Sequence, residues 1–186
     1  MAKGHFIITD ISGYTEFLTQ SELDHAHDIL QSLFKAQLEY IKPPFVISSF
    51  QGDAILMYIP DTSYIQPQSV LEALENLYCS FHSTLEQMQF HTTCTCRACK
   101  GIPLLDLKMV VHHGSYLLQQ MGNREELLGT DVIIPHRMLK NTVVKQTGIK
   151  SYALFSEAAK EALHLQNICR PLQDHTESYE HIGDVN

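Results

Sequence analysis

A short apolar run near the start of the chain, Phe6 to Thr9, ends abruptly on the acidic residue Asp10. The run is too brief for a membrane or signal segment, and it has the length of a buried strand. Ser12 and Gly13 then predict a turn, and an aromatic-rich helical pattern begins at Tyr14. The chain is therefore expected to bring a carboxylate to the tip of a strand, directly ahead of a helix N-terminus whose dipole attracts anions.

Helical and strand-like patterns alternate along the rest of the chain. The sequence predicts a helix over Ile29–Ile41, a hairpin over Phe45–Pro60 turning at Gln51–Asp53, a helix over Gln68–Met88, strands on both sides of Gly114 within Leu104–Gln120, a polar turn at Gly122–Glu126, a helix over Thr130–Val143, a strand at Tyr152–Phe155, a helix capped by Ser156, and a tail strand around Tyr179–Ile182. This order indicates an α/β (α+β) fold, in which helices pack on a mostly antiparallel sheet.

Composition narrows the class of protein. A chain of 186 residues with 44% hydrophobic content predicts one compact domain over residues 1–186. A net charge of -8 without a local Lys/Arg cluster disfavours nucleic-acid binding. The chain has no long apolar run and no signal-peptide pattern, so we expect no membrane partner and a soluble, cytoplasmic protein. Five cysteines, an odd number, fit a reducing compartment.

A cysteine-rich insertion at about residues 90–103 contains Cys94, Cys96 and Cys99 within the stretch HTTCTCRACK. Three thiolates with His91 or Cys79 as the fourth ligand would satisfy a tetrahedral zinc ion. The spacing is nevertheless compressed compared with two separated C-x-x-C knuckles, and an exposed, reduced, thiol-rich loop explains it equally well. Both interpretations remain open from the sequence.

Other metal-ligating residue types give weaker signals. His112 and His113 are neighbours on a predicted strand, so their side chains point to opposite faces and at most one could face a given site. We expect packed or surface histidines there. Cys169 lies far from the other cysteines in sequence and is expected to be a buried apolar side chain.

Five stretches occur in an order that is familiar from one enzyme family. They are FIITDISGYTEFL, FQGDAILMYIP, MVVHHGSYLLQQMG, LLGTDVIIPHRML and YALFSEAA. Together they resemble the catalytic domain of class III nucleotidyl cyclases, over nearly the whole chain. The resemblance implies a ferredoxin-like βαββαβ core.

The resemblance also implies a metal site at Asp10 and Asp53. In the family, the aspartates at these positions bind two Mg²⁺ or Mn²⁺ ions around a nucleoside triphosphate. Carboxylate oxygens suit such hard cations, which can polarise the α-phosphate and neutralise the leaving pyrophosphate. Each aspartate taken alone also fits a simpler role, Asp10 as a helix cap and Asp53 as a hairpin-turn residue.

Four further positions carry the rest of the family's site. Ser49 stands where the family has a base-reading Lys, Glu126 where it has a base-reading Asp or Thr, and Ile133 where an Asn orients the ribose. Arg137 matches the triphosphate-contacting Arg, although a solvated helix arginine is the alternative. Because an isoleucine side chain forms no hydrogen bond, orientation of the sugar would be lost at Ile133.

These matches and departures favour a divergent cyclase-like domain that binds metal and nucleotide, has weak or no cyclase activity, and acts in signalling. The alternatives are an active adenylate- or guanylate-type cyclase and a small zinc-stabilised adaptor with a vestigial site. Family members act as head-to-tail dimers, so the resemblance implies a homodimer. Asp10 and Asp53 of one chain would then face Ser49, Glu126, Ile133 and Arg137 of the other.

Overall fold

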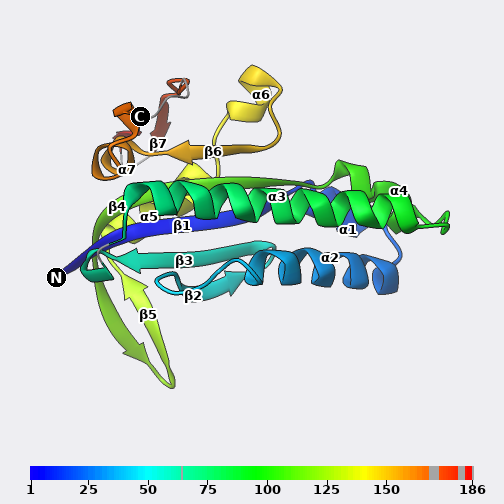
Figure 1. Cartoon of the computed structure of the whole chain (residues 1–186), viewed down its shortest axis with the longest axis horizontal. Coiled ribbons are helices and arrows are strands. Elements are labelled where there is room, and N and C mark those ends of the chain that lie inside the picture. The colour runs from blue at the N-terminus through cyan, green and yellow to red at the C-terminus, as the bar shows by residue number, and fades with distance from the viewer. Residues whose placement is uncertain (64, 168–171, 180–182, 186) are drawn as a thin grey trace.

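The computed structural model describes residues 1–63, 65–167, 172–179 and 183–185 (Figure 1). Its strands are β1 (Ala2–Ser12), β2 (Val46–Gln51), β3 (Ala54–Pro60), β4 (Asp106–Met121), β5 (Arg124–Leu128), β6 (Tyr152–Phe155), β7 (Glu177–Tyr179) and β8 (Gly183–Val185). Its α-helices are α1 (Tyr14–Gln20), α2 (Leu23–Leu38), α3 (Pro67–His91), α4 (Arg97–Gly101), α5 (Thr130–Met138), α6 (Val143–Thr147) and α7 (Glu157–Ala162). Short 3₁₀ helices lie at Asp61–Ser63, Ile102–Leu104 and Leu165–Asn167.

The main sheet has the strand order β2-β3-β1-β4-β5, and β6 pairs with β4. Every pairing in this sheet is antiparallel except that of β6 with β4. The order β4-β1-β3-β2, with α2 and α3 as the crossovers, is that of the ferredoxin-like βαββαβ unit. The predicted fold class, mostly antiparallel with helices packed on the sheet, is confirmed.

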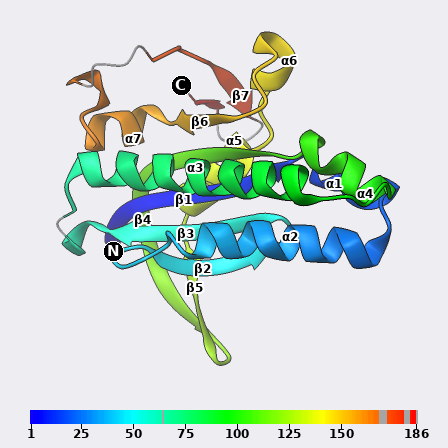
Figure 2. The ribbon, with the colours of Figure 1, turned by 45° about the vertical axis from the view of Figure 1, so that its right-hand side comes forward.

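Both faces of the sheet are covered, because side chains alternate along each strand. Ile7 and Ile11 of β1 pack with α2 and α3 in the larger core. Phe6 and Ile8 point to the other face, where Val132 and Met138 of α5 cover them. Figures 1 and 2 show α2 and α3 side by side along the sheet. Asp10 continues the series of Phe6 and Ile8, so it belongs to the α5 face.

The structure differs from the prediction at Gly114, which does not interrupt the strand. β4 runs unbroken from Asp106 to Met121. A Cβ atom on Gly114 would lie 2.4 Å from the Cβ of Asp131, and the Asp131 carboxylate accepts a hydrogen bond from the Ser115 N–H at 2.6 Å. The glycine therefore makes room for the first turn of α5 against the sheet.

The predicted polar turn at Gly122–Glu126 is wrong beyond its first two residues. Only Gly122 and Asn123 form the turn, and Gly122 has φ 62. Arg124–Leu128 is strand β5, which pairs with the second half of β4. The β4–β5 hairpin extends away from the body of the molecule (Figure 2).

The predicted helix over Thr130–Val143 is two helices. Asn141 separates them, because its side chain donates to the Met138 carbonyl at the end of α5 and accepts from the Val143 N–H at the start of α6. The cap at Ser156 is confirmed, since its hydroxyl accepts from the Ala159 N–H. The tail strand begins earlier than predicted, at Glu177.

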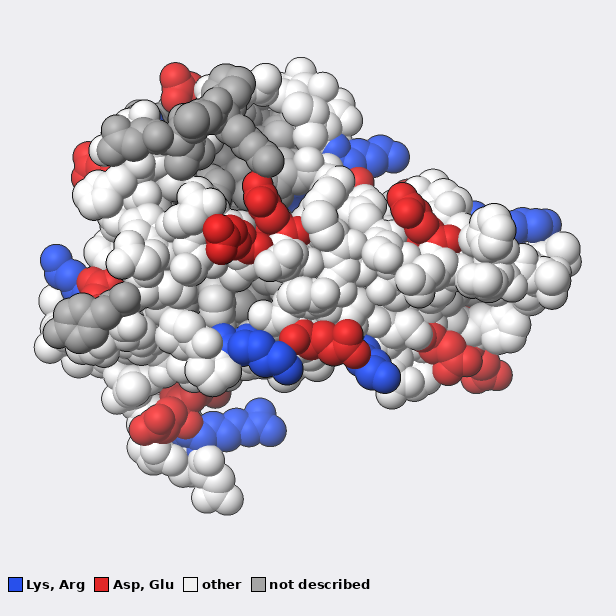
Figure 3. Space-filling model, viewed as in Figure 1, with Lys and Arg blue, Asp and Glu red and all other residues white. Residues whose placement is uncertain are grey.

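Two expectations from the sequence concern residues that lie outside the described ranges. These are the burial of Cys169 and the end of the tail strand at Ile182. Among the helices that the structure describes, none combines the length and apolar character needed to cross a lipid bilayer. On the face shown in Figure 3, Lys and Arg side chains lie scattered among acidic ones, so this face offers no continuous basic patch.

Candidate functional site

Strand register brings Asp10 and Asp53 to adjacent positions. Asp10 pairs with Ala54 across the β1–β3 ladder, and Asp53 directly precedes Ala54 in the two-residue turn of the β2–β3 hairpin. Neither aspartate caps a helix: α1 has Gly13 as its N-cap residue and no side-chain cap. Asp53 does occupy a hairpin turn, as the simpler interpretation expected, but this turn lies beside the end of β1.

The environment of the two carboxylates favours a nearby cation. Partial burial raises the pKa of Asp53, and the neighbouring Asp10 carboxylate raises it further. Two carboxylates this close repel each other when both are ionised. A positive charge between or beside them would remove that cost.

Lys108 provides such a charge within the chain. It pairs with Asp10 across the β1–β4 ladder, and its Nζ lies 2.8 Å from the Asp10 Oδ2. The side chains are 21% and 15% exposed, respectively, so the pair is partly exposed to water. Sequence reasoning missed Lys108, although a lone lysine between Leu107 and Met109 in an apolar strand was a visible signal.

The four residues expected to act from a partner subunit lie on three elements. Ser49 of β2 accepts a hydrogen bond from Gln51, and Glu126 of β5 is exposed. Ile133 is 50% exposed, and Arg137, one turn further along α5, is also exposed. Within the described part of the chain, no hydrogen bond or ion pair joins these residues to Asp10 or Asp53.

The three clustered cysteines converge on a histidine that the sequence did not indicate. One ligand atom each of His25, Cys94, Cys96 and Cys99 lies within 4.8 Å of every other. His91, the predicted fourth ligand, ends α3 and makes an edge-to-face contact with the Phe90 ring, and it is not in this cluster. Cys79, the other candidate, is an exposed free thiol on α3. Because His25 is 69 residues before Cys94, no local spacing could have paired them.

A second group joins His5, Asp61 and His113. The His113 Nε2 lies 3.1 Å from the Asp61 carboxylate, and the His5 Nδ1 lies 3.9 Å from it. Burial, and to a smaller extent the nearby His113, lower the pKa of His5 to about 4. His112 points to the opposite face of β4, where it is buried and its Nδ1 lies 2.7 Å from the Ser156 hydroxyl. The two neighbours therefore face opposite sides, as predicted.

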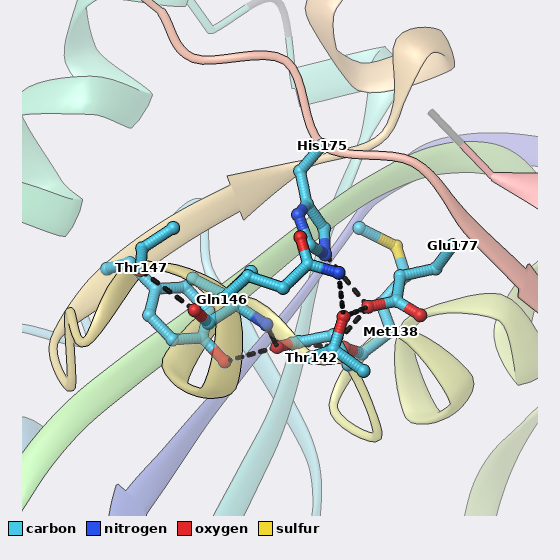
Figure 4. Close-up of polar contacts among 9 residues, drawn as sticks. Met138, Thr142, Gln146, Thr147, His175 and Glu177 are labelled. Carbon is cyan, nitrogen blue, oxygen red and sulfur yellow. Dashed lines mark hydrogen bonds and ion pairs between the residues drawn. The ribbon is translucent and has the colours of Figure 1, made fainter.

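A separate groove of about 580 Å³ lies between β6, α6, α7 and residues 172–176. Beside it, the Glu177 carboxylate accepts hydrogen bonds from the Thr142 N–H and hydroxyl, each at 2.5 Å, and His175 lies 2.8 Å from the same oxygen (Figure 4). The Thr142 hydrogen bonds lower the pKa of Glu177. None of the residues predicted to bind metal or nucleotide is among those that line this groove.

Residues 27–147 match the model of a family described as "Protein of unknown function (DUF2652)". The chain belongs to the DUF2652 family. The matched region of this DUF2652 protein includes Asp53, the three clustered cysteines and Lys108, whereas Asp10 and His25 precede it. The uncharacterized protein Rv2561/Rv2562 of Mycobacterium tuberculosis is 28% identical over 143 residues, which are 75% of this chain and 62% of that protein. The chain thus spans less than two thirds of this relative's length.

Solved structures similar to this DUF2652 protein include nucleotidyl cyclase domains. The guanylyl cyclase Cya2 has a TM-score of 0.74 at 14% identity, covering 100% of this chain and 91% of that one. The adenylyl cyclase CyaB from P. aeruginosa has a TM-score of 0.66 at 17% identity, covering 99% and 91%. A rhodopsin-guanylyl cyclase catalytic core in complex with ATPalphaS has a TM-score of 0.64 at 14% identity, covering 99% and 92%. The DUF2652 chain therefore has the fold of class III cyclase domains, as its sequence motifs predicted.

Proposed function

We propose that this protein is a divergent cyclase-like domain that binds a divalent cation and a nucleoside triphosphate at Asp10 and Asp53, with weak or no cyclase activity. The observation that carries the proposal is the register of β1 and β3, which sets the two aspartates side by side at one sheet end of a cyclase fold. A structural neighbour that contains ATPalphaS supports a nucleotide as the ligand. A role in signalling is part of the same proposal.

The donor set fits a hard cation. Two carboxylates supply the oxygen ligands that Mg²⁺ and Mn²⁺ prefer, and their mutual repulsion is relieved when a cation binds. When bound, two such ions would polarise the α-phosphate, activate the attacking 3′-hydroxyl and stabilise the leaving pyrophosphate. The chain's own contribution is to hold Asp10 rigidly within β1, where neighbouring strands flank it on both sides.

Ile133 is the reason to expect little catalysis. Cyclisation needs the 3′-hydroxyl in line with the leaving pyrophosphate, and misplacement by about an ångström can reduce the rate roughly a hundredfold. Loss of one preorganised polar contact of this kind typically reduces the rate by two or three orders of magnitude, about 3 to 4 kcal/mol. The exposed Ile133 side chain offers no such contact.

A two-fold homodimer would complete the site. Large apolar side chains are exposed on β2, on the β4–β5 hairpin and on α5: Val46, Phe50, Leu117, Leu118, Met121, Leu128 and Ile133. Exposed apolar side chains of this size are a common feature of protein interfaces. In a symmetric pair, the partner subunit's Arg137 would reach the triphosphate held at Asp10 and Asp53.

The test incubates pure protein with Mn²⁺ and each of the four nucleoside triphosphates, with product analysis for cyclic nucleotide and pyrophosphate. Parallel calorimetric titrations measure binding. We expect triphosphate binding that depends on Mn²⁺ and is lost in Asp10→Asn, with feeble turnover. Base selectivity should be poor, because metals and Arg137 contact only phosphates.

Three results would contradict this proposal in whole or in part. Absence of metal-dependent triphosphate binding would remove the ligand itself. Turnover at ordinary cyclase rates would favour the alternative, an active adenylate- or guanylate-type enzyme in which Ile133 is accommodated by another substrate pose. A strong preference for one purine triphosphate would likewise show that Ser49 and Glu126 are not neutral toward the base.

A further inference from the structure

We propose that His25, Cys94, Cys96 and Cys99 form a structural zinc site that fastens the start of α2 to the cysteine segment after α3. His25 lies in the first turn of α2, and Cys96 is the N-cap residue of α4. The two elements lie at the same end of the molecule in both ribbon views (Figures 1 and 2). The site is separate from the carboxylates and does not rest on the function proposed for them.

The distances are those of ligands around one ion. The His25 Nδ1 lies 3.2 Å from the Cys96 sulfur, 3.6 Å from the Cys94 sulfur and 3.8 Å from the Cys99 sulfur. A tetrahedral site with Zn–S bonds of about 2.3 Å and a Zn–N bond of about 2.0–2.1 Å separates nitrogen from sulfur by about 3.6 Å. All four ligand atoms also lie within 4.8 Å of one another, so one ion can reach each of them.

Hydrogen bonding does not explain this convergence. An imidazole nitrogen carries either one hydrogen or one lone pair, so Nδ1 can make one good hydrogen bond to sulfur. Here three sulfurs surround the same nitrogen. A single cation that accepts one lone pair from each of the four groups accounts for all the contacts at once. Three thiolates and one imidazole form a closed Cys₃His set, which is typical of structural zinc.

Contacts outside the four ligands hold the cluster in shape. The Cys99 N–H donates to the Cys96 sulfur at 3.3 Å, a contact that stabilises a thiolate. The Glu22 carboxylate, just before α2, accepts from the Ala98 N–H at 3.1 Å and from the Arg97 Nε at 3.3 Å. These bonds fasten α4 to the start of α2 on the side next to His25, and they limit how far the ligands can separate.

The segment that follows Asp10 packs against α4, which carries Cys99, and against the 3₁₀ helix at Ile102–Leu104. A Cβ atom on Gly101 of α4 would lie 3.0 Å from the buried ring of Phe17 of α1, and one on Gly13 would lie 2.6 Å from the Leu104 carbonyl oxygen. Gly13 has φ 83, so the turn after β1 both requires glycine and rests on this segment. Zinc would therefore also limit movement of the turn beyond Asp10.

The test is the metal content of full-length protein purified under reducing conditions without chelator. We expect one zinc per chain by elemental analysis. Cobalt-substituted protein should show the thiolate charge-transfer band and the intense d–d bands of tetrahedral cobalt. Zinc far below one per chain, octahedral cobalt spectra, or a disulfide among the three cysteines in freshly reduced protein would each overturn the proposal.

His25→Ala and His91→Ala form a matched pair that identifies the fourth ligand. Loss of groups that merely support a ligand typically weakens metal affinity 10- to 100-fold, so loss of His25 itself should weaken zinc affinity by at least about a hundredfold. His91→Ala should bind zinc like the parent protein. Equal affinities in the two variants, or weaker binding only in His91→Ala, would exclude His25 as the ligand. Because both histidines are exposed, neither variant removes a core side chain.

Discussion

The two candidate metal sites of this chain are built in opposite ways. The carboxylates Asp10 and Asp53 are set by the register of neighbouring strands, and Lys108 already neutralises part of their charge. The cysteine site gathers ligands from the start of α2 and from the segment after α3, and no lysine or arginine is paired with its ligand atoms among the described residues. The carboxylate site can therefore exist without a metal, because Lys108 pairs with Asp10. The cysteine site without a metal would place three sulfurs around one nitrogen that can make only one good hydrogen bond.

We infer from this difference that the proposed carboxylate site takes exchangeable ligands, whereas the proposed cysteine site stabilises the fold. Hard cations held by few carboxylates bind weakly and come with their substrate, as Mg²⁺ does with nucleoside triphosphates. A closed thiolate set holds zinc tightly, and the binding free energy becomes part of the folding free energy. The predictions that follow test each half of this contrast, from the largest expected effect to the smallest.

Restoring the family's polar residues should produce the largest change, at the carboxylate site. Ile133→Asn combined with Ser49→Lys should raise purine cyclase turnover by roughly 100- to 1000-fold, because the ribose regains a preorganised contact. Turnover is measured as cyclic nucleotide formed with Mn²⁺. Adding Asp10→Ala to the same background should abolish it. If the double variant is no faster than the parent, the carboxylate pair does not support the chemistry.

Removing a zinc ligand should lower stability without touching the carboxylates. Cys96→Ser should lose zinc and lower the free energy of unfolding by at least about 3 kcal/mol, which is roughly 6–12 °C in Tm for a chain of this size. Differential scanning calorimetry with and without chelator measures the effect. Cys79→Ser, which removes an exposed thiol outside the cluster, is the control and should keep its zinc and its Tm. Equal losses in the two variants would contradict a specific site.

The same contrast explains what sequence alone could predict. Asp10 and Asp53 were paired as a site because their motifs resemble those of class III cyclases, and strand periodicity and a two-residue hairpin turn then place each of them locally. Lys108 could have been found from the same register, once β1 and β4 were known to pair. His25 could not, because only the tertiary packing of α2 against α4 brings it to the cysteines. The role of Gly114 was predicted wrongly for a similar reason. Asp131, which leaves no space for a side chain at this position, comes from another element.

Acid should affect the sheet even when zinc is absent. Burial lowers the pKa of His112 to about 4, below its usual 6.5, so folded protein keeps this imidazole neutral. The unfolded chain takes up the proton first, and stability therefore falls as pH drops from about 6.5 to 4, by about 1.4 kcal/mol per pH unit for one such group. With chelator present, the unfolding free energy of His112→Gln should depend less steeply on pH between about 4 and 6.5. The slope should fall by about 1.4 kcal/mol per pH unit, which corresponds to one proton. An unchanged slope would mean that His112 takes up its proton at the same pH in the folded and unfolded states.

The smallest expected effect comes from substituting Lys108, which tests whether this lysine competes with the metal at the carboxylate site. Lys108→Gln removes the ammonium that lies 2.8 Å from Asp10, so Asp10 would be free to bind a divalent ion without first breaking an ion pair. Partly exposed ion pairs are worth about 1 kcal/mol or less, which limits the gain in Mn²⁺ affinity to roughly three- to fivefold. Lys160→Gln is a matched control, because it removes the same charge from an ion pair with Glu157 on α7. Calorimetric titration should show tighter Mn²⁺ binding in Lys108→Gln than in Lys160→Gln. If Lys108→Gln binds Mn²⁺ more weakly instead, the lysine holds Asp10 in position for the ion. The carboxylate site would then be preorganised by the protein, as the zinc site is proposed to be.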